Sequence, residues 1–358
     1  MNFWVANPDW GFWIIAYFYL AGIAAGSYFL AILIEWFGSH EDQELARIAY
    51  LIAFPLILVC AVCLIVDLER PERFWHMMLK SEVTKEAFAE GFPFSRAGWA
   101  LAVHAPIFKY WSPMSAGSLG LGVFGICSFA SFLAALWPKG WPGPWLFRWP
   151  HLIFQIIGCL AGFFIASYTG TLLTASNQPM WSDTPWMAPL FLASAASTSL
   201  ATMTLIAWWK NLGTPAARER LGGAEPLALT LELIVLGAFA ASLGAYLMPV
   251  LMTWHGEILI VGTLAVGVLA PLLLHALVGR QRPWGVPAAA ICVLVGGLLL
   301  RYGALTTPGE LLVRGPAIEA SFAPEEGRRP GQPGADVENR GPDFRPKSKL
   351  PYDEPGQP

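Results

Sequence analysis

Long apolar runs dominate the chain, and each is close to the length that crosses a lipid bilayer. A helix needs about 20 predominantly apolar residues to span the hydrocarbon core. The pattern predicts eight spans, at approximately 11–36, 47–66, 113–137, 149–173, 185–209, 226–249, 257–279 and 286–305. We therefore expect an all-α fold, a polytopic membrane helix bundle with about eight transmembrane helices.

A ninth apolar segment, Ala97–Trp111, is shorter than the others. It contains His104 and Pro106 and follows Arg96 directly, so we interpret it as interfacial or re-entrant. Prolines support the predicted boundaries, because a missing N–H is tolerated in the first turn of a helix. These prolines are Pro113, Pro150, Pro185 and Pro226.

The end of the chain has a different composition. Residues 306–358 are rich in Pro, Gly and charged residues, and such a segment buries too little apolar surface to order itself. We expect a transmembrane domain over 1–305 and an extended tail over 306–358. The tail is either a disordered terminus or an arm that lies across a soluble partner subunit.

Composition agrees with the pattern. The chain is 55% hydrophobic and 13% charged, far from the roughly 25% charged residues of soluble proteins, which excludes a water-soluble globule. A net charge of −3 without a dense Lys or Arg block argues against a nucleic-acid partner. The five cysteines lie in apolar stretches, which favours packing over a disulfide framework or an iron–sulfur cluster in this chain.

The distribution of positive charge bears on orientation. Short loops after the first, third, fifth and seventh spans carry Lys and Arg, whereas the short segments around 174–184 and 250–256 carry none. Positive residues in short loops mark the cytoplasmic side, so eight spans place both termini outside, in the periplasm of a prokaryotic inner membrane. A nine-span arrangement with the N-terminus inside satisfies the charge bias equally well.

Polar groups gather at the end of several spans on one predicted side. The second span ends at Asp67, followed by Arg70 and Arg73; the fourth ends at Tyr168 and Thr169; and the next loops supply Asn177, Trp181, His255 and Glu257. Hydroxyl, carboxylate and imidazole groups walled by apolar helices suit a ligand with an apolar body and a small polar head that exchanges protons, such as a quinone. The alternative is a solvated helix end at which Arg70 or Arg73 pairs with Asp67.

Five motifs in order resemble the NrfD/polysulfide reductase membrane-subunit family, over roughly residues 10–305. They are Ala21-Gly-Ile-Ala-Ala-Gly26-Ser, Asp67-Leu-x-Arg-Pro-x-Arg-Phe74, Trp111-Ser-Pro-Met-Ser115, Tyr168-Thr-Gly170 and Asn177-x-Pro-x-Trp-Ser-Asp-Thr-Pro-Trp186. The small residues of the first motif permit close helix packing.

The resemblance implies a subunit that reacts with menaquinone or ubiquinone and carries no haem, metal or iron–sulfur cluster itself. It implies a ferredoxin-like iron–sulfur partner, with a molybdopterin-type catalytic subunit or the subunits of alternative complex III. It also implies quinone contacts at Tyr17, Asp67 and Tyr168, whereas His255 and Glu257 are candidates from position alone.

Several polar residues inside the predicted spans are candidates for a proton path. They are Glu232, His151, Gln155, His275 and Arg301, and intramembrane ionisable groups are often functional. The alternative is that each is separately solvated or paired.

Two further functions remain open from the sequence. A cytochrome b-type anchor would hold haem between histidines such as His151 and His275. A transporter is expected to show internal repeats, and no convincing repeat is found.

Overall fold

The computed structural model describes residues 10–39, 42–68, 70–79, 81–91, 94–104, 112–136, 144–176, 178–278 and 284–322. Within these ranges the chain is helical and contains no β-strand. Eight helical spans are long and apolar enough to cross a membrane, which confirms the predicted all-α bundle. The chain divides into two compact units, Met1–Ile318 and Glu319–Pro358, and the second unit is described only over Glu319–Phe322, which is helical.

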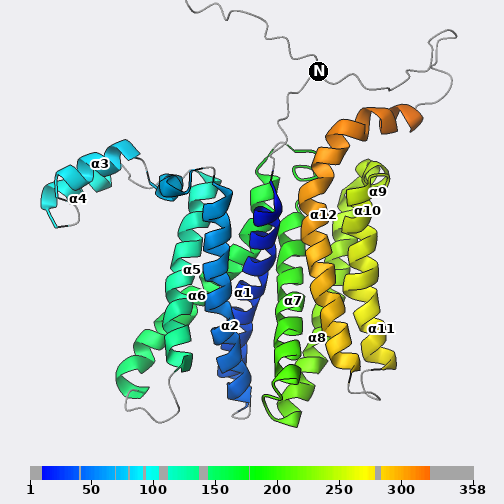
Figure 1. Ribbon diagram of the computed structural model, residues 1–358, viewed down its shortest axis with the longest axis horizontal. Helices are drawn as coiled ribbons and strands as arrows, with labels where there is room; N and C mark the ends of the chain where they lie inside the picture. Colours follow the sequence, from blue (N-terminus) through cyan, green and yellow to red (C-terminus); the bar gives the residue numbers. More distant parts are fainter. Residues whose placement is uncertain are drawn as a thin grey trace, which may run out of the picture. The chain divides into compact units, whose positions relative to one another are not determined.

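Six of the spans are single helices in the first part of the chain: α1 (Phe12–Phe37), α2 (Gln43–Asp67), α5 (Pro113–Leu136), α6 (Pro144–Thr174), α7 (Met187–Trp209) and α8 (Pro215–Ser242). The seventh is composite, with α10 (Trp254–Glu257), the π-helix η4 (Ile258–Leu269) and α11 (Ala270–Leu277). The eighth is α12 (Gly285–Phe322). Figure 1 shows these helices running side by side.

The remaining elements are short. They are η2 (Pro71–Met77), α3 (Ser81–Ala89), α4 (Arg96–His104), η3 (Gly244–Tyr246) and α9 (Leu247–Leu251). At 9 residues, α4 cannot span a bilayer, and it packs against α3. The segment Ala97–Trp111 therefore contributes no ninth span within its described part, which ends at His104.

Alternate spans run in opposite directions, so the bundle has two faces. We call the Asp67 face the one where α1 begins and α2 ends, and the Arg220 face the opposite one. The start of α5, the end of α6 and the start of α10 lie at the Asp67 face, as the chain order requires.

Two predicted boundaries were wrong at prolines. The sixth span begins at Pro215, not Pro226, because Thr214 caps the helix: its hydroxyl accepts the Ala217 N–H at 3.2 Å. Pro226 and Pro150 lie inside helices, since one proline removes only one backbone hydrogen bond. The sixth span also ends early, at Ser242, because Gly244 turns the chain with a φ of +53°.

The predicted start of the tail was also wrong, because residues 306–322 continue α12. Side chains support the backbone there: the hydroxyls of Thr306 and Thr307 donate to the carbonyls of Tyr302 and Gly303, at 2.8 and 2.6 Å. Residues 323–358 lie outside the described part of the chain, so the extended arm stays a prediction for that segment.

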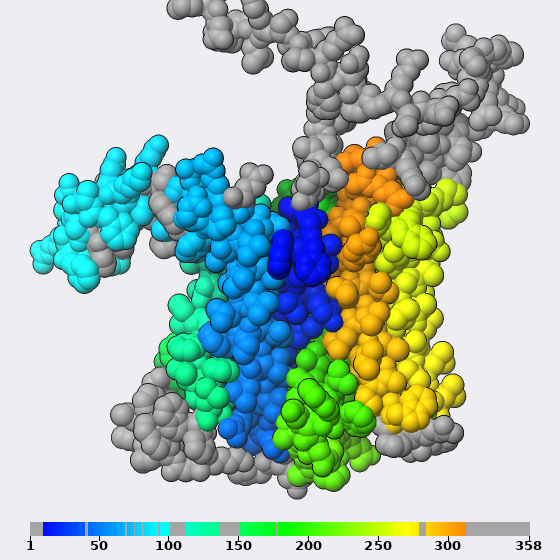
Figure 2. Space-filling model, in the orientation of Figure 1, coloured from blue at the N-terminus to red at the C-terminus, as the bar shows by residue number. Residues whose placement is uncertain are grey.

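Helix α1 is the centre of the packing. It contacts α2, α6 and α7, and in Figure 2 only part of its length, in dark blue, reaches the surface on this face. The small residues of its motif between positions 21 and 27, for which the sequence predicted close packing, are all buried: Ala21, Gly22, Ala24, Ala25, Gly26 and Ser27. A Cβ on Gly26 would lie 2.5 Å from both the carbonyl oxygen of Ala195 and Oγ of Ser199, so α7 approaches α1 at this distance only because position 26 has no side chain.

The Arg220 face is tied by ionic contacts. Nη2 of Arg220 lies 2.8 Å from Oδ1 of Asp42, and the Ser39 N–H donates to Asp42 Oδ2 at 2.9 Å. Burial favours a higher pKa for Asp42, but the hydrogen bonds from Ser39 and Arg220 outweigh it and leave the pKa of Asp42 below its ordinary value. The start of α8 is thereby fixed to the turn between α1 and α2.

Helices η4 and α12 cross through two glycines. A Cβ on Gly267 would lie 2.8 Å from Cα of Gly296, and a Cβ on Gly296 would overlap the backbone of Gly267. We expect Gly296→Ala to lower the free energy of unfolding by about 1–3 kcal/mol, because backbone cannot yield as a flexible side chain does. Thermal unfolding in detergent measures this. Gly237→Ala, where a Cβ meets no atom within 4 Å, is the matched control, and equal unfolding temperatures would contradict the prediction.

Candidate functional site

A cavity of about 160 Å³ opens between α1, α2, α5 and α6 at the Asp67 face. Tyr17 of α1, Asp67 of α2 and Tyr168 of α6 all line it. Its other walls are mostly apolar: Trp10, Ile14, Phe18, Leu64, Leu68, Met114, Gly117, Ser118 and Leu172. The three residues that the family resemblance implied as quinone contacts, far apart in sequence, therefore share one cavity.

Two polar groups of this cavity are without protein partners. Among the described residues, neither the Tyr17 hydroxyl nor the Asp67 carboxylate has a hydrogen bond or an ion pair. The alternative in which Arg70 or Arg73 pairs with Asp67 is not observed, since both arginines are exposed and make no such contact in the described part of the chain. A carboxylate and a phenol that are unpartnered in an apolar cavity are free to bind a ligand with polar ends.

Tyr168 is held in place by a glycine that sequence reasoning missed. The Tyr168 hydroxyl donates to the Pro113 carbonyl at 2.6 Å, and a Cβ on Gly117 would overlap the Tyr168 ring. Position 117 therefore has to be glycine for the ring to lie against α5. The sequence signal was the small-residue stretch after Pro113, which contains Gly117.

Trp181 does not line the cavity but packs against Trp10, which does. Its ring stacks on Trp10, a lining residue, with ring centroids 5.3 Å apart. Its Nε1–H donates to the Ala304 carbonyl at 2.6 Å. Pro308 has no N–H for that carbonyl, which lies four residues earlier in α12, so the indole takes the place of the missing helical donor.

The loop that carries Trp181 is built around one unusual residue. Met180 has a φ of +71°, a conformation uncommon outside glycine, and its N–H donates to Oδ2 of Asp183 at 2.9 Å. Met180 and Trp181 are both almost fully buried. Asp183 therefore supports the turn that directs Trp181 inward.

Other predicted contacts lie beside the cavity and do not line it. Thr169 is buried and its hydroxyl donates to the Ala166 carbonyl of its own helix at 3.2 Å. Arg70 and Arg73 lie at the exposed start of η2. Asn177 lies outside the described residues.

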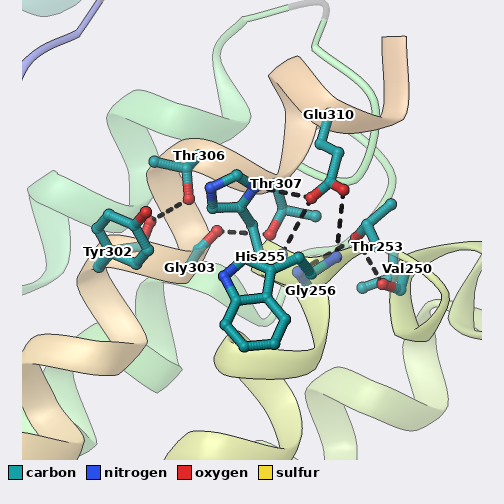
Figure 3. A network of polar contacts seen from close by, with 10 residues as sticks. Val250, Thr253, His255, Gly256, Tyr302, Gly303, Thr306, Thr307 and Glu310 are labelled. Atoms are coloured by element: carbon teal, nitrogen blue, oxygen red, sulfur yellow. Dashed lines mark hydrogen bonds and ion pairs between the residues drawn. The ribbon is translucent and has the colours of Figure 1, made fainter. Parts of the chain in front are cut away.

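His255 and Glu257 belong to a different part of the bundle. His255 Nδ1 lies 2.7 Å from Glu310 Oε2, and the same carboxylate accepts the N–H groups of Trp254 and His255 at 3.2 and 3.0 Å. Figure 3 shows Glu310 reaching from α12 to the start of α10. His255 thus joins two helices, and Glu257 is exposed. Sequence reasoning missed Glu310 because it assigned that segment to the tail.

The five candidates for a proton path fall into two separate clusters. In the first, Gln155 Nε2 donates to Glu35 Oε2 at 2.6 Å and to the Tyr50 hydroxyl at 2.9 Å, and that hydroxyl donates to Glu35 Oε2 at 2.8 Å. The His151 ring lies against Tyr50, with centroids 6.4 Å apart. This cluster joins α1, α2 and α6.

The second cluster surrounds a buried arginine. Arg301 is 1% exposed, and its guanidinium donates to Ser194 Oγ at 2.7 Å and to the carbonyls of Gly297, Phe18 and Phe191 at 3.1, 3.4 and 3.5 Å. Ser197 Oγ, one helical turn from Ser194, donates to Glu232 Oε2 at 2.5 Å. Two serines of α7 therefore lie between a buried cation and a buried carboxylate.

Glu225 extends the second cluster toward the Arg220 face. It is fully buried, and its Oε2 lies 3.3 Å from His275 Nε2. Glu225 and Glu232 are seven residues apart on α8, so they lie on one side of the helix, about 10 Å apart along its axis. Sequence reasoning missed Glu225 because it began this span at Pro226.

His151 and His275, the two histidines predicted as candidates for haem, lie apart. His151 lies against Tyr50 and His275 against Glu225, in different clusters. Among the described residues, no group of three or more His, Cys, Asp or Glu side chains is arranged to hold a metal ion.

Three known proteins have sequences similar to this chain. The sequence is 33% identical to a selenate reductase subunit from Mesobacillus selenatarsenatis over 22% of its length and 18% of that protein. It is 26% identical to a polysulfide reductase chain from Wolinella succinogenes over 55% of its length and 57% of that protein. It is 26% identical to protein NrfD of Escherichia coli over 82% of its own length and 92% of that protein.

The matches thus span less than two thirds of the first two relatives. The sequence model of the family described as "Polysulphide reductase, NrfD" matches residues 5–313, nearly the whole helical part of the chain. The protein therefore belongs to the polysulphide reductase NrfD family, a membrane-subunit family of redox complexes.

Proposed function

We propose that this chain is the quinone-reactive membrane subunit of a respiratory oxidoreductase, exchanging electrons between the quinone pool and an iron–sulfur subunit. The observation that supports this best is the cavity in which Tyr17, Asp67 and Tyr168 meet. Aromatic and aliphatic walls suit the ring of menaquinone or ubiquinone, and polar groups without protein partners suit its oxygen atoms.

Each polar group has a distinct part in this proposal. Oxidation of a quinol gives up an electron pair and both hydroxyl protons. Asp67 is the base that accepts one hydroxyl proton, and the half-buried position of its carboxylate at the end of α2 lets it pass the proton to water at the Asp67 face. The other proton leaves toward the Arg220 face by the route through Glu232 that is proposed below. The Tyr17 hydroxyl donates a hydrogen bond to a ring oxygen. Tyr168 is a wall of the cavity, since its hydroxyl already donates to Pro113.

The electrons require a partner. No metal-binding group of side chains occurs among the described residues, and two relatives are named as parts of reductases. We propose that a ferredoxin-like iron–sulfur subunit docks at the Asp67 face, linked to a molybdopterin-type catalytic subunit or to the subunits of alternative complex III. Both termini then lie on the periplasmic side of a prokaryotic inner membrane.

The second cluster supports a coupled movement of protons. A series of buried polar groups runs through α7, α8, α11 and α12. It starts with Glu225 and His275, continues with Glu232, Ser197 and Ser194, and ends at Arg301. Such groups are costly in a membrane unless they are used or paired. We propose that Glu232 carries protons between the cavity and the Arg220 face, away from the cavity when a quinol is oxidised and toward it when a quinone is reduced, with water molecules between the side chains.

Asp67→Asn tests the base. We expect quinol oxidation to fall by about 10²-fold or more, since the variant keeps the volume but loses the proton acceptor. The measurement is quinol-dependent electron transfer by the purified complex, with assembly checked by size-exclusion chromatography. Glu257→Gln, at the same face but outside the cavity, is the matched control and should keep the wild-type rate. Normal turnover by Asp67→Asn would reject this role.

Removal of residues 323–358 tests the arm. The segment is Pro- and Gly-rich and charged, so it contributes contacts to a partner and not to the helical core. We expect the truncated protein to unfold at the wild-type temperature but to lose most of its iron–sulfur partner during purification in detergent. Co-purification of the partner in full amount would show that the segment is dispensable.

Glu232→Gln tests the coupling. In vesicles that contain the whole complex, we expect the variant to lose most proton movement across the membrane while much of the electron transfer remains, because Gln keeps the hydrogen bond from Ser197 but cannot carry a proton. Glu35→Gln in the first cluster is the comparison and should leave proton movement intact. If Glu35→Gln lost proton movement and Glu232→Gln kept it, the route would belong to the first cluster.

A further inference from the structure

A second hollow lies next to the cavity, between α2, α5 and η2. It is a groove of about 280 Å³. Its lining is apolar apart from Ser118, and the Ser118 hydroxyl donates to the Met114 carbonyl at 3.0 Å. The groove therefore offers a ligand dispersion contacts and burial but no unsatisfied side-chain polar group.

The groove is continuous with the cavity at the Asp67 face. Leu64, Leu68 and Ser118 line both hollows. From this junction the groove follows α2 as far as Phe54, a distance of about 20 Å along the helix. At that end Phe54 packs against Phe129 and Phe132 of α5, with ring centroids 4.9 and 5.2 Å apart.

The groove is open on the side that faces lipid. Leu58 of its lining is 55% exposed, and α2 is a spanning helix, so this surface contacts hydrocarbon chains in a membrane. A long flexible apolar chain can enter sideways and continue into the bilayer beyond Phe54.

We propose that this groove holds the polyprenyl tail of the quinol whose head binds in the adjoining cavity, so that the subunit recognises its substrate by the tail as well as by the ring. The inference rests on the proposed quinone reaction. A cavity of about 160 Å³ is smaller than the roughly 300–1,000 Å³ of pockets that enclose a whole ligand, so the part of the molecule beyond the ring must lie elsewhere. The groove starts where the cavity ends and accepts only apolar groups.

Two glycines keep the groove open. Gly122 and Gly125 of α5 line it, and a Cβ built on either would meet no atom within 4 Å. A larger side chain at these positions therefore starts from a Cβ that touches no other atom and extends into the groove. Leucine also favours the helix more than glycine does, so the substitution does not weaken α5.

The test compares Gly122→Leu and Gly125→Leu with Gly237→Leu. Gly237 lies on α8, where a Cβ also meets no atom within 4 Å, so it controls for the added apolar surface. Each variant is purified as the complex and assayed in liposomes with ubiquinol-10 and menaquinol-7, and in solution with the tail-free duroquinol and menadiol. We expect the groove variants to raise KM for the long-chain quinol that the wild type uses by about tenfold or more and to leave the tail-free quinols unchanged.

A second measurement does not depend on turnover. Quinone extracted from the purified protein is quantified by mass spectrometry, and we expect the groove variants to retain several-fold less long-chain quinone than Gly237→Leu. Wild-type KM and wild-type quinone content in both groove variants would overturn the inference, as would an equal loss for long-chain and tail-free quinols. Loss of bound phospholipid with unchanged quinone would assign the groove to a lipid tail and also overturn it.

Failure of the inference is distinguishable from failure of the proposed function. If the wild-type complex oxidises no quinol and Asp67→Asn changes nothing, the quinone reaction itself is wrong. If wild type is active and Asp67→Asn is not, while Gly122→Leu and Gly125→Leu match Gly237→Leu, only the tail site is wrong.

Discussion

The close approach of neighbouring helices to α1 is the constraint on which the site depends. In lipid, helix association relies on packing and on hydrogen bonds, because hydrocarbon chains are as apolar as the helices themselves. Gly26 lets α7 reach α1, and Gly22 leaves space for the guanidinium of Arg301, whose Nη2 would lie 2.9 Å from a Cβ at that position. With these helices fixed, Tyr17 is held opposite the ends of α2 and α6.

The buried polar groups divide into two kinds, and the difference indicates their use. Arg301 is surrounded by acceptors, namely three carbonyls and one hydroxyl, and so the protein itself offsets the cost of its burial. Asp67 and the Tyr17 hydroxyl lack such partners among the described residues. Groups of the first kind have their hydrogen bonds supplied by the protein, whereas groups of the second kind are available to a substrate.

Much of the fold could be predicted from hydrophobic length alone. Eight spans were correct because a bilayer imposes a minimum helix length. Boundaries failed where Pro226 was read as a helix start and where the composition of 306–358 was read as a tail. A hydroxyl cap at Thr214 begins α8 earlier, and α12 continues past residue 305, where Glu310 accepts the His255 N–H. Those two errors concealed Glu225 and Glu310, whose carboxylate oxygens lie 3.3 and 2.7 Å from ring nitrogens of His275 and His255.

The candidate site was predictable in part, because sequence motifs selected some of its residues and predicted membrane side alone selected others. Tyr17, Asp67 and Tyr168 were selected through the family resemblance, and the three side chains do line one cavity. His255 and Glu257 were chosen by their side of the membrane, which does not specify position within the bundle. Gly117 could not be found from periodicity, because its importance depends on the Tyr168 ring, 51 residues later in the sequence.

The environment of Arg301 has a consequence for how the protein is made. Its acceptors come from α1, α7 and its own helix, and α12 follows α1 and α7 in the chain, so it leaves the ribosome after them. A lone guanidinium at mid-membrane is costly, but the Phe18 and Phe191 carbonyls and the Ser194 hydroxyl are already in the bilayer when α12 is inserted. Because the arginine lies in a helix that follows its acceptor helices in the chain, those helices can provide its hydrogen bonds as soon as it is inserted.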